Sequence, residues 1–194
     1  MVWPTKPSDY TTDKMIQDIL AVADACRADR FTIWGMSYGG NISRYLAAQS
    51  DRVKKAVLMG TRLGTGVPEE IRQDIERFCT HWPPIIQAQH DGTLDLDTLS
   101  QDDREFLQNF NVPVIMAWGR VRLDWPTIEP NDLSCSTLWL IGSEDHLAVN
   151  SFREYEHSLP DSQVQCHIVA GATHSGVFDE IDQVFPILLA FMQS

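Results

Sequence analysis

One short stretch constrains the fold of this chain more than any other. Residues 30–40 read RFTIWGMSYGG, which is a short apolar run, then the pattern Gly-x-Ser-x-Gly, then the start of a predicted helix near Gly40. A serine at a sharp turn between a strand and a helix has strained backbone, so glycines are expected on both sides of it to avoid clashes. The helix N-terminus would direct its N–H groups and the positive end of its dipole toward Ser37. The stretch therefore predicts an exposed nucleophile at a strand-to-helix turn.

Two later segments add residues of complementary chemistry. The strand-like run 136–141 is followed by Gly-Ser-Glu-Asp, which ends at Asp145, and the alternating run 164–169 leads to Gly-Ala-Thr-His, which ends at His174. A serine hydroxyl is a poor nucleophile until an adjacent imidazole accepts its proton. A carboxylate can hold that imidazole in the required tautomer and stabilise the imidazolium. Ser37, Asp145 and His174 are therefore candidates for nucleophilic catalysis.

Each of these residues also has a structural interpretation. Ser37 could lie in an ordinary glycine turn, and His174 could cap the helix expected after it. Glu144 competes directly with Asp145 as the acid, although Asp145 fits the Gly-x-x-Asp spacing after the strand. We interpret His146 as a loop residue rather than a base.

The three motifs together resemble those of the α/β-hydrolase family, and specifically of its capped members. The motifs are Gly-Met-Ser-Tyr-Gly at 35–39, Gly-Ser-Glu-Asp at 142–145 and Gly-Ala-Thr-His at 171–174, and the likeness runs from about Met1 to the C-terminus. The resemblance implies a mostly parallel sheet within an α/β fold and a helical cap insertion. It implies the chain order nucleophile, acid, base, and an oxyanion donor in the backbone N–H of Tyr38. The sequence has no phosphate loop or dinucleotide fingerprint, so we expect no cofactor. A serine nucleophile argues against the haloalkane dehalogenases and epoxide hydrolases, which share the capped architecture.

The resemblance also implies that the hydrolase core is N-terminally truncated. Thirty residues precede Phe31, and they hold one predicted helix, at 12–26. Residues 3–11 resemble the family segment that follows the loop after its fourth strand. The run 31–34 is therefore expected at an open sheet edge, which is a template for self-association. The family's second oxyanion donor, from an earlier loop, is expected to be absent, and removing such a donor costs about 2.7–4 kcal/mol elsewhere.

A change of periodicity marks an insertion between two core segments. We predict a core of residues 1–61 and 132–194 and a helical cap at 62–131. Helices are expected at 68–80, 101–111 and 114–122, with His-Trp-Pro-Pro at 81–84 ending or bending the first of them. In capped hydrolases such an insertion covers the nucleophile. Trp82 and Trp118 are therefore candidate substrate-binding residues, and the alternative is that they pack the cap against the core.

Composition narrows the class of protein. The formal net charge of −12 argues against nucleic-acid binding, and the chain has no 18-residue apolar run that would span a membrane. We find no metal-ligand spacing and no leader sequence, and we expect a cytoplasmic protein. Its four scattered cysteines are expected to be reduced and mostly buried: Cys26, Cys79, Cys135 and Cys166.

The sequence therefore predicts a serine hydrolase that cleaves a small apolar ester or lactone through an acyl-enzyme. Amide hydrolysis, perhydrolysis and carbon–carbon cleavage stay open, because the pocket rather than the three residues selects among them. The alternatives are a hydrolase-like ligand-binding or inactive protein, or a truncated gene product that lacks the oxyanion loop. A small-molecule substrate is the expected partner.

Overall fold

The computed structural model describes residues 3–64 and 67–194. The chain forms two compact units: one holds residues 1–14 and 66–125, and the other holds residues 15–65 and 126–194. Residues 1, 2, 65 and 66 fall within the predicted domain ranges but lie outside the described residues. The predicted division into a core of 1–61 with 132–194 and a cap of 62–131 stays a prediction.

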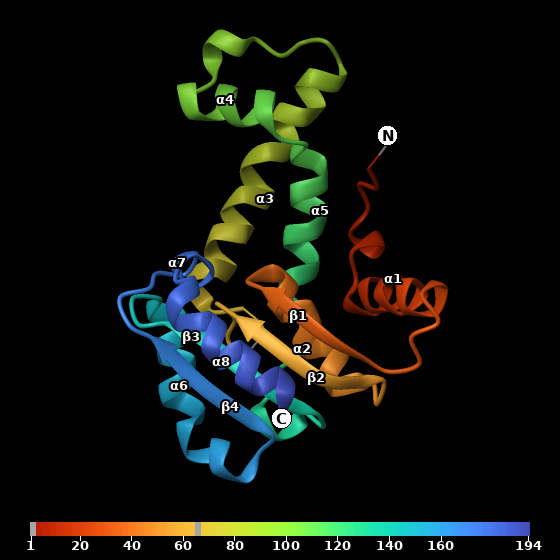
Figure 1. Cartoon of the computed structure of the whole chain (residues 1–194). Helices are drawn as coiled ribbons and strands as arrows, with labels where there is room; N and C mark the ends of the chain where they lie inside the picture. Colours follow the sequence, from red (N-terminus) through yellow and green to blue (C-terminus); the bar gives the residue numbers. More distant parts are fainter. Residues whose placement is uncertain (1–2, 65–66) are drawn as a thin grey trace. The chain divides into compact units, whose positions relative to one another are not determined.

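The larger unit contains a sheet of parallel strands. In chain order its strands are β1 (Phe31–Met36), β2 (Val53–Met59), β3 (Ser136–Gly142) and β4 (Val164–Val169), shown in Figure 1. Their spatial order in the described part of the chain is the same, β1-β2-β3-β4, and each neighbouring pair is parallel. The predicted α/β fold class with a mostly parallel sheet is confirmed. All carboxyl ends therefore meet at one edge of the sheet.

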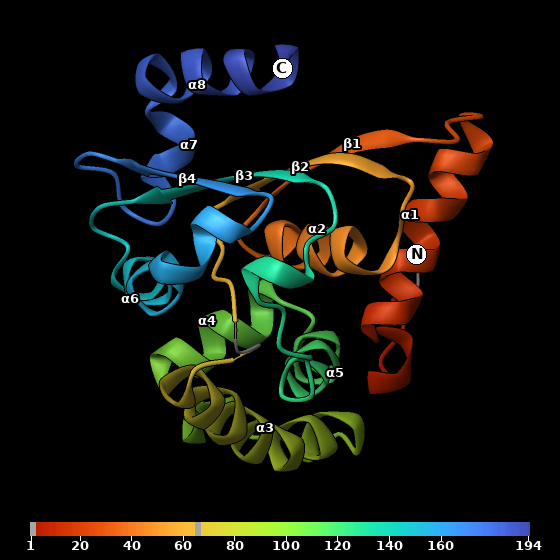
Figure 2. The same cartoon turned by 90° about the horizontal axis from the view of Figure 1, so that it is seen from below.

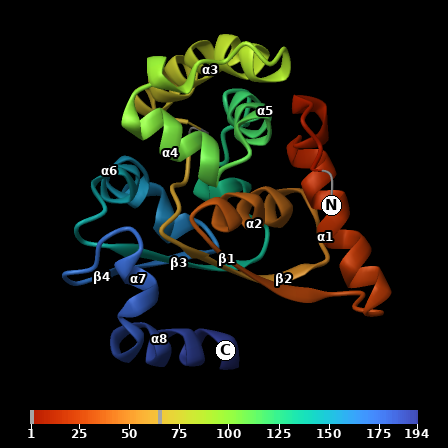
Figure 3. The same ribbon diagram turned by 90° about the horizontal axis from the view of Figure 1, so that it is seen from above.

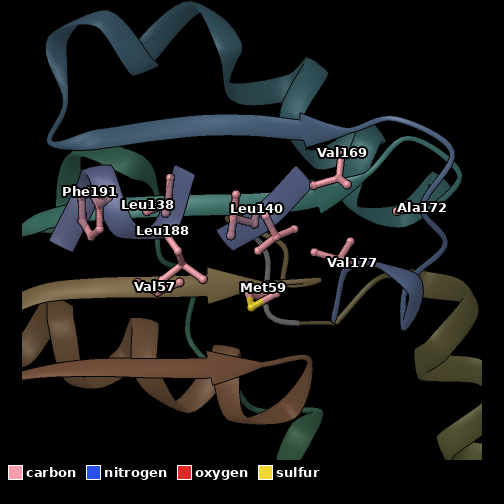
Figure 4. Packing of buried hydrophobic residues seen from close by; sticks show 10 residues of the cluster. Val57, Met59, Leu138, Leu140, Val169, Ala172, Val177, Leu188 and Phe191 are labelled. Atoms are coloured by element: carbon pink, nitrogen blue, oxygen red, sulfur yellow. The ribbon is translucent and has the colours of Figure 1, made fainter. Parts of the chain in front are cut away.

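Helices cover both faces of this sheet. In Figures 2 and 3, α8 (Ile181–Gln193) lies on one face, and α2 (Tyr38–Gln49) and α6 (His146–Tyr155) lie on the other. Strand β3 is buried on both faces from Thr137 to Gly142, as expected for an interior parallel strand. Figure 4 shows the core beneath α8, where Leu188 and Phe191 pack toward side chains of β2 and β3.

The remaining elements of this unit connect the strands or end the chain. They are most of α1 (Thr12–Ala25), η3 (Pro130–Asp132), η4 (Glu156–Asp161) and α7 (Gly176–Asp179). The α1 helix matches the helix predicted at 12–26 within one residue. No helix among the described residues is both long enough and apolar enough to cross a bilayer.

The smaller unit is helical. Its elements are η1 (Pro7–Asp9), α3 (Glu69–His90), η2 (Leu96–Thr98), α4 (Gln101–Asn109) and α5 (Val112–Arg122). Helices α3 and α5 pack against each other, and a methyl group added at Gly119 would lie 3.4 Å from Ile75 Cγ2. The helices predicted at 101–111 and 114–122 correspond to α4 and α5.

The predicted end of the first inserted helix is wrong. Helix α3 continues through Pro83 and Pro84 to His90. An interior proline costs a helix about 3 kcal/mol, because it lacks the N–H donor and its ring clashes with the preceding turn. Aromatic packing opposes this cost here: Trp82 is buried, and its ring lies 5.8 Å from that of Phe78 and 5.4 Å from that of Phe106. Tertiary packing therefore overrides a local helix-breaking signal.

The expectation of mostly buried cysteines is also wrong. All four thiols are free, but only Cys135 is buried, whereas Cys26 is exposed and Cys79 and Cys166 are partly exposed. Desolvation nevertheless raises the pKa of the Cys166 thiol to about 12. Because the thiolate is the reactive form, this group is a weak nucleophile at neutral pH.

A buried arginine, which the sequence analysis missed, ties α2 to both ends of the inserted segment. Arg44 is 0% exposed, and its Nη1 donates to the carbonyl oxygens of Arg62 at 2.5 Å and Gly64 at 3.4 Å. Its Nη2 donates to Tyr45 Oη at 3.0 Å, and Tyr45 Oη donates to the Pro126 carbonyl at 3.0 Å. Burial lowers the pKa of the Arg44 guanidinium. These bonds therefore hold the chain to α2 both where it leaves the larger unit and where it returns to it.

Strand β1 forms an apolar edge of the described sheet. It pairs with β2 on one side, and Trp34 in its centre is 52% exposed. A groove of about 710 Å³ follows this edge between the strands and the C-terminal helices. Its walls include Met59, Phe178, Phe185 and Leu189. An exposed apolar edge of this kind favours strand pairing with another chain.

We propose that this 194-residue chain, studied by itself, self-associates through β1. Light scattering should show a mass that rises with concentration, and Trp34→Lys should lower it, because a charge on an edge strand opposes pairing. The matched control is Ile168→Lys on β4, the strand at the opposite side of the described sheet, where Ile168 is also exposed. A wild-type protein that stays monomeric would contradict the expectation, as would dissociation caused equally by the control.

Candidate active site

Ser37 lies in strained backbone between β1 and α2. Its φ is 50° and its ψ is −110°, a conformation that costs a non-glycine residue of order 1–3 kcal/mol. Its N–H donates to the Met59 carbonyl at 2.8 Å, which anchors the turn to the neighbouring strand β2. The predicted strand-to-helix turn is therefore present, and α2 begins at Tyr38, directly after the serine.

Glycine is sterically required at Gly35, as expected, but the second position that requires it is Gly40 rather than Gly39. A methyl group at Gly35 would lie 2.2 Å from the Gly39 carbonyl oxygen, and one at Gly40 would lie 1.9 Å from Thr61 Oγ1. A methyl group at Gly39 would have no described heavy atom within 4 Å. The expectation that glycine is required on both sides of Ser37 is therefore wrong for Gly39. An added methyl group at Gly35 would meet the backbone of α2, and one at Gly40 would meet the Thr61 side chain in the loop after β2.

Asp145 follows β3 and accepts two hydrogen bonds with its two carboxylate oxygens. Oδ1 accepts from the Ala148 N–H at 3.2 Å, which caps α6, and Oδ2 lies 2.6 Å from His174 Nδ1. The Asp145 side chain is 6% exposed. The cap to α6 fixes the carboxylate, so that its second oxygen is directed at the imidazole.

The loop that carries His174 is held against the loop after β3. The N–H of Ser143 donates to the Val169 carbonyl at 3.0 Å, and the N–H of Glu144 donates to the Ala172 carbonyl at 2.9 Å. A methyl group at Gly142 would lie 2.2 Å from the Ala172 oxygen, so this approach needs glycine. Glu144 thus contributes a backbone contact, whereas the carboxylate that contacts the imidazole comes from Asp145.

The structure brings Ser37, His174 and Asp145 together. His174 Nε2 lies 2.8 Å from Ser37 Oγ, although the two residues are 137 positions apart. Because the Asp145 carboxylate accepts a hydrogen bond, the hydrogen of a neutral imidazole belongs on Nδ1, which leaves Nε2 to accept the proton of Ser37. The His174 side chain is half exposed. The arrangement can therefore activate the serine hydroxyl while the imidazole stays open on one side.

Gly60 lets His174 cross the end of β2, a role that sequence reasoning missed. Strand β2 lies between β1 and β3, so the imidazole that joins Ser37 to Asp145 must pass over the end of β2. Gly60 has a φ of 53°, and a methyl group there would lie 3.0 Å from the His174 carbonyl and 3.4 Å from Cε1 of the ring. A glycine directly after the apolar run of β2 was the available signal.

The other predicted site residues lie at the start of α2 and in the helical unit. Tyr38 is the first residue of α2, so its amide lies at the N-terminal end of that helix, and its phenol donates to Met15 Sδ at 2.7 Å. Trp82 and Trp118 belong to the helical unit. Trp82 is buried among aromatic rings, and the guanidinium of Arg122 lies 4.5 Å from the Trp118 ring centre. Their roles in oxyanion or substrate binding stay predictions.

Comparison with known proteins identifies the fold. The sequence model of the family described as alpha/beta hydrolase fold matches residues 3–78. A solved carboxylesterase structure from the thaumarchaeon Nitrososphaera gargenis matches with a TM-score of 0.69 and 19% identity, covering 100% of this chain and 74% of that one. The chain has the α/β-hydrolase fold. No curated protein matches its sequence significantly.

Other solved structures share this α/β-hydrolase fold but differ in described activity. A thermophilic esterase from Thermogutta terrifontis matches with a TM-score of 0.68 and 18% identity, covering 94% of this chain and 72% of that one. A structure described under novel epoxide hydrolases from metagenomes of hot environments matches with a TM-score of 0.64 and 18% identity, covering 97% and 76%. The fold alone therefore does not select a reaction.

Among the residues that the structure describes, no group of three or more histidine, cysteine, aspartate or glutamate side chains is arranged to hold a metal ion. The chemistry available at the carboxyl ends of the strands is that of the hydroxyl, the imidazole and the carboxylate.

The α/β-hydrolase turn should respond in opposite ways to alanine at its glycines. Gly35→Ala should lower the free energy of unfolding by about 1–3 kcal/mol, because the new methyl group meets backbone that cannot yield easily. Gly39→Ala should be neutral or stabilising by up to about 1 kcal/mol, since alanine favours helix. Urea unfolding of the two variants measures both effects. Equal destabilisation would contradict the steric assignment.

Proposed function

We propose that this chain is a serine hydrolase that cleaves a small apolar ester or lactone through an acyl-enzyme. Ser37 acts as the nucleophile, His174 as the general base and Asp145 as the residue that orients the imidazole. The observation that carries the proposal is the unbroken hydrogen-bonded path from Ser37 Oγ through both ring nitrogens of His174 to Asp145 Oδ2, with contacts of 2.8 and 2.6 Å. The esterase structures of the same fold support it.

The first half of the proposed reaction forms the acyl-enzyme. Ser37 Oγ attacks the ester carbonyl carbon while its proton passes to His174 Nε2. The carbonyl π electrons move onto oxygen, and the oxyanion is stabilised by backbone N–H donors, of which we propose Tyr38 as one. When the tetrahedral intermediate collapses, the C–O bond to the alcohol breaks, and His174 returns the proton to the leaving oxygen. The imidazolium is stabilised throughout by Asp145.

The second half of the reaction releases the acid. A water molecule gives its proton to His174 Nε2 and attacks the acyl carbon, and the bond to Ser37 Oγ then breaks with the proton returned to Oγ. The half exposure of the His174 side chain leaves room for this water. For a lactone the leaving alcohol stays attached to the acyl group, so the product is a single hydroxy acid.

The choice of Ser37 sets this reaction apart from that of an epoxide hydrolase. A serine forms an ester with an acyl group, and the ester is then hydrolysed by water that attacks the same carbonyl carbon. The resemblance to capped hydrolases implies aspartate at this position in epoxide hydrolases. The serine therefore favours an acyl substrate, although a neighbour of similar fold is described as an epoxide hydrolase.

Removal of each catalytic group tests the proposal. Ser37→Ala should abolish labelling by a fluorophosphonate probe and lower any ester turnover by several orders of magnitude, as the loss of a triad nucleophile does elsewhere. His174→Ala should be nearly as damaging. Asp145→Asn should lower the rate by about 10³–10⁴, because it favours the wrong imidazole tautomer. Measurement uses probe labelling followed by mass spectrometry, together with a panel of p-nitrophenyl esters.

The matched control for the acid is Glu144→Gln, which should change the rate little, because Oδ2 of Asp145 and not Glu144 contacts the imidazole. The opposite order of the two variants would move the orienting role to Glu144. A wild-type protein that neither labels at Ser37 nor turns over any ester would favour the alternative of a hydrolase-like binding or inactive protein.

Trp118 is the better of the two candidate substrate-binding residues. Trp82 is 3% exposed and packs among Phe78 and Phe106, so Trp82→Ala should mainly lower stability, by about 3–5 kcal/mol. Trp118 is partly exposed. Trp118→Ala should change the preference for acyl chain length more than the rate on p-nitrophenyl acetate. An unchanged preference would make Trp118 a packing residue as well.

A further inference from the structure

Met59, the last residue of β2, and the two residues that follow it contact both ends of the Ser37–His174 pair. The Met59 carbonyl accepts the Ser37 N–H, and Gly60 lies directly beneath the His174 imidazole. Thr61, the third residue, places its hydroxyl 3.2 Å from the Ser37 carbonyl oxygen and 3.2 Å from the Met59 carbonyl oxygen, so that its single hydrogen is shared between these two acceptors. The Thr61 hydroxyl thus lies beside the hydrogen bond that joins the Ser37 backbone to β2.

The Ser37 carbonyl oxygen lies within hydrogen-bond distance of three donors. It accepts from the Asn41 N–H at 3.0 Å, from Asn41 Nδ2 at 3.0 Å and from Thr61 Oγ1 at 3.2 Å. The Asn41 donors belong to α2, the helix that begins directly after Ser37, whereas the Thr61 donor comes from the loop that follows β2. A strained conformation persists only when its surroundings over-determine it. Thr61 supplies the side-chain contact that ties this carbonyl to the sheet.

We propose that Thr61 is a positioning residue for Ser37, and that it holds the strained turn in place through the Ser37 carbonyl oxygen. This inference rests on the proposed function of Ser37 as a nucleophile. The Thr61 hydroxyl contacts the carbonyl oxygens of Ser37 and Met59, so it acts through the backbone of the serine rather than on the reacting atoms.

Thr61 is itself held in place by burial and by a hydrogen bond to its backbone. It is 1% exposed, and its carbonyl accepts from Trp139 Nε1 at 2.6 Å, with Trp139 fully buried in β3. A methyl group at Gly40 would lie 1.9 Å from Thr61 Oγ1, so glycine at position 40 makes the space that the hydroxyl occupies. Gly40, the second glycine of the Gly-Gly pair, therefore leaves space for the Thr61 hydroxyl.

The consequence for chemistry is geometric. Ser37 Oγ must stay within hydrogen-bond reach of His174 Nε2, and a displacement of about 1 Å at a catalytic group can cost of order 100-fold in rate. Without the Thr61 hydroxyl, the Ser37 N–H keeps its bond to the Met59 carbonyl, and the Ser37 carbonyl keeps its bonds from Asn41. The Ser37 carbonyl loses only the hydrogen bond that the Thr61 side chain donates. We expect the serine to sample other positions, which lowers its reactivity without changing the ionisable groups around it.

The test compares variants of two buried threonines. Thr61→Val keeps the side-chain shape and removes the hydroxyl, whereas Thr61→Ser keeps the hydroxyl. Thr137→Val is the matched control: Thr137 is 0% exposed in β3, and its hydroxyl donates to the Cys135 carbonyl at 3.0 Å, near the amino end of the sheet. The readouts are the second-order rate of fluorophosphonate labelling at Ser37 as a function of pH and, by NMR, the exchange rate of the Ser37 amide hydrogen.

We expect Thr61→Val to slow labelling about tenfold at every pH, with the midpoint of the pH profile unchanged, and to speed exchange of the Ser37 amide about tenfold. Thr61→Ser should stay within about threefold of wild type in both readouts, and Thr137→Val should leave both unchanged even where its thermal stability falls. Should Thr61→Val fail to fold, Thr61→Cys against Thr61→Ser makes the same comparison, since a thiol is a weak donor.

Three results would overturn the proposal. The first is a Thr61→Val variant whose labelling rate and amide exchange rate equal those of the wild type. The others are a Thr137→Val variant that loses as much labelling rate as Thr61→Val, and a Thr61→Ser variant as impaired as Thr61→Val. A wild-type protein that does not label at Ser37 would count against the proposed function instead. The exchange rate of the Ser37 amide then decides the positioning role alone, because faster exchange in Thr61→Val supports it and an unchanged rate refutes it.

Discussion

The parallel alignment of the four described strands is the constraint on which the site depends. It brings the carboxyl ends of β1, β3 and β4 to one edge of the sheet, so that residues 137 positions apart in the chain lie within 2.8 Å. Strand β2 separates the nucleophile from the acid, and the imidazole spans it. A side chain at the end of β2 would obstruct that crossing, and Gly60 provides none.

The turn at Ser37 has strained backbone at the place where the chemistry is proposed, and contacts from several sides hold it. Close backbone approach at Gly35 and Gly40, the Met59 carbonyl and the Thr61 hydroxyl all act on the same few atoms. Such over-determination is what keeps an unfavourable φ populated. The same unit also buries Arg44, whose guanidinium donates to the carbonyl oxygens of Arg62 and Gly64. This buried cation thus fixes the path of the chain through its bonds to neutral backbone groups.

The fold permits more than one reaction, and the identity of single side chains narrows the choice. Solved structures of this fold are described as esterases and as epoxide hydrolases at 18–19% identity to this chain. A serine at the turn favours acyl transfer, and the hydrogen-bonded path to Asp145 is the arrangement that such transfer needs. The substrate depends on the walls of the pocket, which the serine, the imidazole and the carboxylate do not specify.

The sequence by itself determined the strands, the glycine-flanked serine and the order of Ser37, Asp145 and His174, because those signals are local: apolar runs, turn residues and spacing. It left Glu144 and Asp145 as competitors for the role of the acid, because the sequence does not show which of two adjacent side chains points toward the imidazole. That orientation follows from the cap that Asp145 forms on α6 and from the packing of the loop after β4. It misplaced the end of α3 at Thr80, because aromatic packing outweighs the helix-breaking signal of the two prolines that follow. Gly60 and Thr61 emerged only from the tertiary structure, since their roles depend on which strand lies between two others.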